Sequence, residues 1–282
     1  MMGRIGIVIE LSKVRIACLA TASAAAGFVL AAHGVSAVMV PALLGVFLLA
    51  SGAGALNQAQ EGDIDALMRR TMNRPVPSHR IRAREGFVVA IALLAAGSAL
   101  LYAASPVAML LGFVTVLWYN AIYTPLKRVT AFAAIPGGVV GAIPPVIGWV
   151  AGGGSAVDPR ILAVAYFFFV WQVPHFWLLL MRIGDDYDRA GLPTLTRMFT
   201  RAQFARIIYV WMITTMVACV SMPLFGVSSQ PWIQAGLILS SLWLGWHATR
   251  MVWTNGRMLA FHQINLYALV VISLLSISGL AG

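Results

Sequence analysis

Charged side chains are scarce in this chain. They make up 10% of its 282 residues, whereas 60% of the residues are hydrophobic. A water-soluble domain carries about 25% charged residues, so the composition excludes an ordinary soluble fold. Long apolar runs recur along almost the whole sequence, and a helix needs about 20 apolar residues to cross a bilayer. The sequence therefore predicts an all-α, polytopic membrane protein whose helices form one bundle around a central cavity.

Cysteine is also nearly absent, because only Cys18 and Cys219 occur. Each lies inside a long apolar run, and the two are far apart in sequence. Neither a redox pair nor a disulfide framework is indicated. No cleavage site separates the first apolar run from the second, so we expect a retained helix there and not a signal peptide.

Acidic residues are the scarcest charged group, with nine against 19 Lys and Arg and a formal net charge of +10. The basic residues lie in short stretches beside apolar runs, so we expect topology, and no nucleic acid, to explain them. We predict nine spans, at about residues 14–32, 35–56, 86–104, 106–123, 133–151, 160–181, 205–226, 231–253 and 264–280. With a cytoplasmic N-terminus, only Arg160 of the 19 basic residues falls on the opposite side, as the positive-inside rule predicts. We therefore expect a multi-pass protein of a bacterial cytoplasmic (inner) membrane, with its N-terminus in the cytoplasm.

The acidic residues gather on the same predicted face, Asp158 excepted. Two clusters follow the second and sixth spans, and they consist of Glu61, Asp63 and Asp65, then Asp185, Asp186 and Asp188. The loops of the opposite face are short and carry almost no charge. We therefore expect any active site to open toward the cytoplasm.

A helix that continued past Asn57 would place Asn57, Glu61 and Asp65 in a row on one face, because they recur every four residues. Carboxylate and amide oxygens suit Mg²⁺, which commonly bridges carboxylates to substrate phosphates. Asp63 falls on another face, where we expect it to pair with an arginine. A second interpretation stays open at this point, in which all these acids only neutralise arginines at the membrane surface.

Several cations near these clusters could grip phosphate oxygens directly. They are Arg69, Arg70, Arg74, Lys127 and Arg128. The prolines on either side of Val76 predict an ordered turn, which could aim Arg74 inward. From this segment alone we favour the alternative, a solvated connection that carries positive charge.

Polar and aromatic residues inside predicted spans give three further hypotheses. An intramembrane Asn120 needs a partner, and Tyr123 beside it is either an interfacial anchor or part of an aromatic wall that stabilises a cation. The glycines and prolines of Ile135 to Trp149 predict close helix approach and a widened cavity, or packing alone. His175 is a hydrogen-bonded core residue, an iron ligand or a partner of a carboxylate.

These motifs together resemble the UbiA-type intramembrane prenyltransferases, and within that family the heme-prenylating branch. The resemblance covers nearly the whole chain, as one domain over residues 1–282. It is carried by the row at Asn57, Glu61 and Asp65, by Asn73-Arg74-Pro75, by Tyr123 to Arg128, by Gly137 to Trp149, by Trp171 to Phe176 and by Asp186-Tyr187. In two places the chain departs from the family pattern, because Glu61 replaces an aspartate and Gly184 stands where relatives often carry a basic residue.

The resemblance implies a Mg²⁺-dependent transfer of the farnesyl group of farnesyl diphosphate to a vinyl group of heme B, with addition of water, to give heme O. The catalytic residues it implies are Asn57, Glu61, Asp65 and Asp186, and the metal ligands are these four with Asp185. For the diphosphate it implies Arg70, Arg74, Lys127 and Arg128. For the other substrate groups it implies Asn120, Tyr123, Gln172, His175 and Tyr187.

The same resemblance implies a heme A synthase or the assembly of a terminal oxidase as protein partners. Three other functions remain open on the sequence. They are prenylation of an aromatic quinone precursor, heme binding during assembly without catalysis, and ion-coupled transport through the paired acidic clusters.

Overall fold

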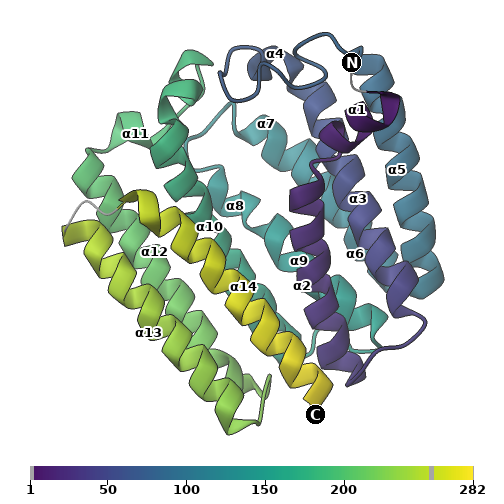
Figure 1. Cartoon of the computed structure of the whole chain (residues 1–282), viewed down its shortest axis with the longest axis vertical. Coiled ribbons are helices and arrows are strands. Elements are labelled where there is room, and N and C mark those ends of the chain that lie inside the picture. Colours follow the sequence, from purple (N-terminus) through teal and green to yellow (C-terminus); the bar gives the residue numbers. More distant parts are fainter. Residues whose placement is uncertain (1–2, 254–256, 282) are drawn as a thin grey trace.

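Helices are the regular secondary structure of the described part of the chain. The computed structural model describes residues 3–253 and 257–281, and no β-strand occurs within these ranges. The long helices stand side by side in one bundle, with the N-terminus at one end and the C-terminus at the other (Figure 1). In chain order the elements are α1 (Arg4–Leu11), α2 (Val14–Ala32), α3 (Met39–Gln60), α4 (Gly62–Asp65), α5 (Ala83–Ala104), α6 (Pro106–Leu117), the π-helix η1 (Trp118–Tyr123), α7 (Thr124–Leu126), α8 (Ala134–Gly137), α9 (Val139–Ala151), α10 (Pro159–Arg189), α11 (Leu195–Met198), α12 (Arg201–Ser221), the 3₁₀-helix η2 (Met222–Phe225), α13 (Pro231–Trp253) and α14 (Arg257–Ala281). The predicted all-α membrane fold is confirmed.

The predicted number of spans is slightly wrong. Among the described residues, eight helices are long and apolar enough to cross a membrane, and α13 is not one of them. This helix has 23 residues and lies between α12 and α14, but it carries Gln234, His247 and Arg250 together with several hydroxyl side chains. These polar groups lower its mean hydropathy. The prediction of nine spans is wrong here because the segment is long enough to cross a membrane but not apolar enough.

Helix α10 is longer than predicted, and this moves the second acidic cluster from a loop onto a helix. It has 31 residues and contains the non-helical residue Ile183, with φ −121° and ψ 16°. The kink turns the last segment, which carries Asp185 and Asp186, away from the direction of the main helix. The acidic end of α10 therefore leans over the end of the bundle where α4 lies (Figure 1).

The second predicted span also ends differently, because α3 does not continue through Glu61. This residue has φ −110° and ψ 15°, which is outside the helical region. The four-residue hydrogen-bond spacing nevertheless survives the break, since the amide of Glu61 donates to the carbonyl of Asn57 at 3.0 Å and that of Asp65 donates to Glu61 at 2.8 Å. The predicted row is kept although the continuous helix is not.

Close backbone contact joins α2 to α9, as the glycines of Ile135 to Trp149 predict. A Cβ placed on Gly27 would meet the carbonyl oxygen of Pro145, and one placed on Gly148 would meet that of Ala24. Because the contact atoms belong to backbone, they cannot move aside as a flexible side chain would. The two helices pack directly against each other and form one wall of the bundle.

We expect Gly148→Ala to destabilise the protein, because its new methyl group collides with the backbone of α2. Overpacking of this kind costs about 1–3 kcal/mol. Thermal unfolding of the purified protein in detergent should show a lower midpoint. Gly34→Ala is the matched control, since a Cβ there meets nothing within 4 Å, and an equal effect of both variants would contradict the packing argument.

Candidate functional site

One cavity runs into the bundle from the end where α4 lies. It has a volume of about 360 Å³ and is lined by residues of α2, α3, α4, η1, α9 and α10. Its charged lining includes Lys13, Glu61, Asp65, Arg74 and Lys127, and other parts of the wall are apolar. A cavity that joins charged groups to an apolar wall fits a ligand with a polar head and a hydrocarbon body.

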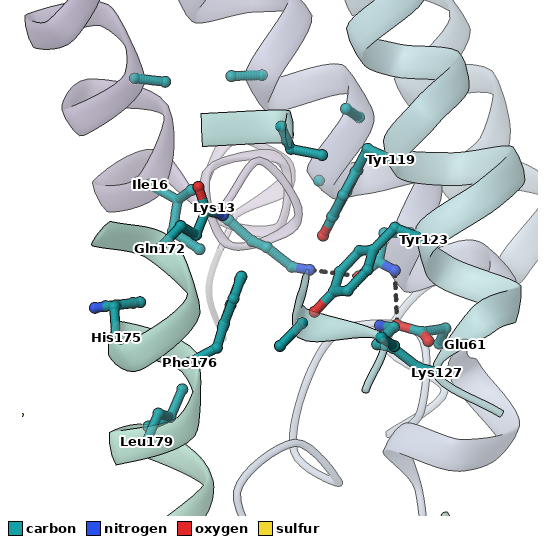
Figure 2. A pocket seen from close by; sticks show the side chains of 18 of the residues that line it. Lys13, Ile16, Glu61, Tyr119, Tyr123, Lys127, Gln172, His175, Phe176 and Leu179 are labelled. Atoms are coloured by element: carbon teal, nitrogen blue, oxygen red, sulfur yellow. Dashed lines mark hydrogen bonds and ion pairs between the residues drawn. The ribbon is translucent and has the colours of Figure 1, made fainter. Parts of the chain in front are cut away.

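The predicted row lies at the charged end of the cavity, where Figure 2 shows Glu61 beside Lys127. Asn57, Glu61 and Asp65 are 2%, 7% and 5% exposed. The ammonium of Lys127 lies 2.7 Å from the Glu61 carboxylate, and the guanidinium of Arg74 lies 2.8 Å from that of Asp65. The side-chain amide of Asn57 donates to Glu61 at 2.6 Å. Buried charges are tolerated when they are paired and hydrogen-bonded in this way.

The loop after α4 is ordered and aims Arg74 inward, as its prolines predict. The hydroxyl of Thr71, which is fully buried, donates to the carbonyl of Asp65 at 2.8 Å, and the amide of Arg74 donates to the carbonyl of Thr71 at 2.9 Å. The amide of Ser78 then donates to the carbonyl of Arg74 at 3.0 Å. The solvated connection is therefore the wrong alternative for this segment.

Lys13 belongs to the same group, although its place in the sequence predicts only a positive charge at the membrane surface. It lies between α1 and α2 in a left-handed conformation, with φ 46°. Its ammonium donates to the side-chain oxygen of Asn57 at 2.6 Å. Burial, together with the positive charges of Arg74 and Lys127, lowers the pKa of Lys13 to about 7. No local spacing indicates this residue, because only the packing of α1 and α2 against α3 brings it to Asn57.

The second acidic cluster reaches the loop after α4 through Asp186 alone. Its carboxylate accepts hydrogen bonds from the amides of Arg69 and Arg70 at 3.2 and 3.3 Å, and it pairs with Arg189 at 3.2 Å. Asp186 does not line the cavity, whereas Arg70 and Tyr187 do. Asp186 therefore shapes the loop that carries a cavity cation.

Two other predicted residues lie outside the cavity. Asp185 is exposed and is absent from its wall. Arg128 is held at the surface by Asp63, which it binds through two hydrogen bonds of 3.1 Å. The expected pairing of Asp63 with an arginine is confirmed, but it removes Arg128 from the group that could meet a ligand.

Gly184 is adjacent to Asp185 and departs from the family pattern for a visible reason. A Cβ on Gly184 would lie 3.2 Å from the hydroxyl of Thr196 in α11. A side chain at this position would require the side chain of Thr196 to shift.

Asn120 and Tyr123 lie on η1, where a π-helix interrupts the end of the fourth span. Asn120 has the partner that an intramembrane amide needs, because it donates to Gln60 at 3.0 Å and to the carbonyl of Ala53 at 3.2 Å. It joins η1 to α3 and does not line the cavity. Tyr123 does line it and stacks with Tyr119 at a centroid distance of 5.9 Å. Both tyrosines line the cavity, as an aromatic wall requires.

Gln172 and His175 continue the wall on α10. The side chain of Gln172 lies against Gly141, where a Cβ would collide with its amide oxygen. His175 stacks on Trp171 with a centroid distance of 4.9 Å and lies 5.3 Å from Phe261 of α14. Its Nδ1 atom is buried and has no hydrogen-bond partner among the described residues. An orphaned ring nitrogen of this kind is available to a ligand.

The oxygen donors of the row have the right chemistry for magnesium. The described residues contain no group of three Asp, Glu, His or Cys side chains close enough to hold a metal ion by themselves. Mg²⁺ does not require such a group, because it keeps several waters and is usually bound by one or two carboxylates together with substrate phosphates. Glu61 and Asp65 at the cavity wall fit that description.

Comparisons with known proteins agree with this architecture. The model of the UbiA prenyltransferase family matches residues 19–269. A protoheme IX farnesyltransferase of Geobacter sulfurreducens is 42% identical over 228 residues, which cover 80% of this chain and 84% of that protein. One of Oleidesulfovibrio alaskensis is 35% identical over 277 residues, which cover 96% of this chain and 95% of that protein.

Solved structures share the fold at much lower identity. A structure of digeranylgeranylglyceryl phosphate synthase superposes with a TM-score of 0.81 at 12% identity and covers 100% of both chains. A UbiA homologue from Archaeoglobus fulgidus bound to GPP and Mg²⁺ has a TM-score of 0.73 at 16% identity and covers 98% of this chain and 100% of that one. With the family model matched over most of its length, this chain belongs to the UbiA prenyltransferase family, an integral membrane family of prenyl-transferring enzymes.

Proposed function

We propose that the protein transfers the farnesyl group of farnesyl diphosphate to a vinyl group of heme B, with addition of water, to make heme O. The observation that carries the proposal is one cavity in which paired buried charges meet an apolar and aromatic wall. A prenyl diphosphate is divided in the same way, because it joins a charged diphosphate head to a hydrocarbon tail. Relatives that match most of the chain are named protoheme IX farnesyltransferase, and this supports heme as the acceptor.

The charged end binds the diphosphate in this proposal. Lys13, Arg70, Arg74 and Lys127 line the cavity and would donate hydrogen bonds to the phosphate oxygens. Asn57, Glu61 and Asp65 would hold Mg²⁺, and Asp186 would hold the loop that carries Arg70 through its hydrogen bonds to the amides of Arg69 and Arg70. The bound metal supplies Lewis-acid stabilisation of the leaving diphosphate. The UbiA homologue from Archaeoglobus fulgidus binds GPP and Mg²⁺, which supports a prenyl diphosphate and a divalent metal here.

The chemical step needs charge stabilisation at both ends of the breaking bond. The bond between the farnesyl C1 carbon and the diphosphate oxygen breaks, and the cations of the cavity stabilise the negative charge that develops on the diphosphate. The rings of Tyr119, Tyr123 and Phe176 line the path of the allylic cation and stabilise it through their π faces. A vinyl carbon of the heme forms a bond to C1. Water then adds to the resulting cation and releases a proton, which leaves a hydroxyl group.

The acceptor lies along α10 in this proposal. Gln172, His175 and Tyr187 are its contacts on the cavity wall, and the orphaned Nδ1 of His175 is free to bind or orient the heme. The cytoplasmic face of a bacterial inner membrane is the location that the distribution of basic residues supports, with the N-terminus on that side. A heme A synthase or an oxidase assembly step would receive the product.

Product analysis tests this function directly. We expect the purified protein, supplied with heme B, farnesyl diphosphate and Mg²⁺, to form heme O, which mass spectrometry identifies. A prenylated quinone precursor as the only product would indicate the related aromatic prenyltransferases. Heme binding without any product would indicate an assembly protein, and substrate flux in proteoliposomes without transfer would indicate a transporter.

We expect Asp65→Asn to abolish Mg²⁺-dependent turnover, with a loss of at least about 10²-fold, because one transition-state contact of this kind is worth that much. Asp63→Asn is the matched control, since that carboxylate lies at the surface with Arg128. Size-exclusion chromatography checks that both variants fold. Near-normal turnover of a folded Asp65→Asn protein would remove Asp65 from the metal site.

Lys127 and Arg128 provide a second comparison of a site residue with a control. They are adjacent in sequence, but Lys127 pairs with the buried Glu61, whereas Arg128 pairs with the exposed Asp63. We expect Lys127→Gln to lower kcat/KM for farnesyl diphosphate by about 10²-fold, as loss of one charged donor does. Arg128→Gln should stay within about twofold of the wild type, because an exposed ion pair contributes little. Equal losses in the two variants would contradict the placement of Arg128 outside the site.

His175 is tested by spectroscopy without turnover. We expect His175→Ala to shift the absorption spectrum of bound heme or to weaken heme binding, because the variant lacks the free ring nitrogen. His79→Asn is the control, since His79 is exposed and its left-handed conformation suits Asn. An unchanged spectrum and affinity would return His175 to a packing role.

A further inference from the structure

A row of aromatic rings crosses α10 and has a cation at each end. In order, its members are Lys127, Tyr123, Phe176, His175, Phe261 and Arg182. The first cation belongs to the charged end of the cavity. The last one, Arg182, has no role in the proposed transfer step.

The first half of the row lies inside the cavity. The ammonium of Lys127 is 5.2 Å from the ring centroid of Tyr123, and that ring stacks on Phe176 at 6.0 Å. In Figure 2 the ring of Phe176 points from α10 toward Tyr123, whereas the ring of His175 points away from the charged group. Phe176 therefore separates the charged end from a second region beside α10.

The second half of the row joins α10 to α14. His175 lies 5.5 Å from Phe176 and 5.3 Å from Phe261, and the guanidinium of Arg182 lies 5.2 Å from the Phe261 centroid. His175 and Arg182 are seven residues apart, so they share one side of α10. Because α10 runs toward the end that carries α4 (Figure 1), Arg182 lies nearer the water than His175 does.

Arg182 has no carboxylate partner among the described residues, unlike Arg189 and Arg197 on the same side of the bundle end. Ion pairs to carboxylates occupy Arg74, Lys127, Arg128, Arg189 and Arg197. Within residues 3–253 and 257–281 no hydrogen bond or ion pair involves the guanidinium of Arg182. In a regular helix Asp185 and Asp186 would be within its reach, three and four residues later, but the non-helical Ile183 turns that segment away. The kink leaves an exposed guanidinium on an aromatic ring with its donors free.

We propose that Arg182 binds a carboxylate side chain of the porphyrin acceptor and thereby orients the opposite, vinyl-bearing edge toward the cavity. This inference rests on the proposed function, because it extends the acceptor site from His175 on the cavity wall to Phe261 and Arg182, which lie next to His175 but outside that wall. The porphyrin has vinyl groups on one edge and two carboxylates on the opposite edge. The vinyl edge would face the end of the row at Lys127, where the diphosphate binds, and the carboxylates would face the free guanidinium of Arg182. The flat macrocycle packs on His175 and Phe261, and its carboxylates stay at the aqueous edge. Guanidinium is the group best suited to this contact, since its planar fork matches a carboxylate.

Arg182 is a positioning residue in this scheme, so its substitution acts on the acceptor and not on the diphosphate. We expect Arg182→Gln to raise the KM for heme B by about tenfold, a loss in the usual range for a charge-assisted hydrogen bond, with the KM for farnesyl diphosphate unchanged. Arg182→Lys should recover part of the loss, because it keeps the charge without the fork. Arg201→Gln, at an exposed arginine in the first turn of α12, is the matched control.

The dimethyl ester of heme B gives the decisive comparison, because it lacks both carboxylates. We expect the wild-type protein to bind the ester about as weakly as Arg182→Gln binds heme B, and the substitution to add no further loss with the ester. Titration of each porphyrin by absorbance, without farnesyl diphosphate, measures this independently of turnover.

The possible negative results distinguish a failure of this inference from a failure of the proposed function. A wild-type protein that makes heme O, with the same heme affinity in Arg182→Gln, would overturn the carboxylate contact and leave the proposed function intact. An equal loss with heme B and with its dimethyl ester would assign Arg182 to packing on Phe261. A wild-type protein that neither binds nor prenylates heme would overturn the proposed function and this inference with it.

Discussion

The burial of charge at the end of α3 is the constraint on which the site depends. Two carboxylates and an amide are almost fully removed from water, and such charges are stable only when partners reach them with good geometry. The partners come from distant parts of the chain, namely Lys127 after η1 and Arg74 in the loop after α4. Helix α3, the loop and the end of η1 must therefore meet at one place, and the cavity forms where they do.

Departures from regular helix structure determine the shape of that cavity. Three helices depart from regular geometry near their charged ends, at the break at Glu61, the π-helix at Trp118–Tyr123 and the kink at Ile183. Without the kink, the acids of α10 would lie beside Arg182. Irregular helices are often found at functional sites for this reason.

In the proposed reaction, the division of the cavity into a charged end and an aromatic wall would give each substrate its own surroundings. Cations and carboxylates would face the diphosphate, where they would stabilise the negative charge that grows during bond cleavage. Aromatic rings would line the region where a positive charge appears and would stabilise it through their π faces. Tyr123 belongs to both parts of the cavity, because Lys127 lies over its ring while Phe176 stacks on it. This contact would place the leaving group and the acceptor on neighbouring surfaces.

The sequence by itself determined the class of fold, the polar end of the bundle and the core of the site. Apolar length predicts spanning helices, and the four-residue recurrence of Asn57, Glu61 and Asp65 is a local property that survives a helix break. Tertiary structure alone decided which cations reach the row. Lys13 enters from the N-terminal segment, whereas Arg128 is taken by Asp63 at the surface, and no spacing distinguishes these two basic residues. The physical reason is that a side chain's partner depends on the backbone direction at its own position and on helices far away in sequence.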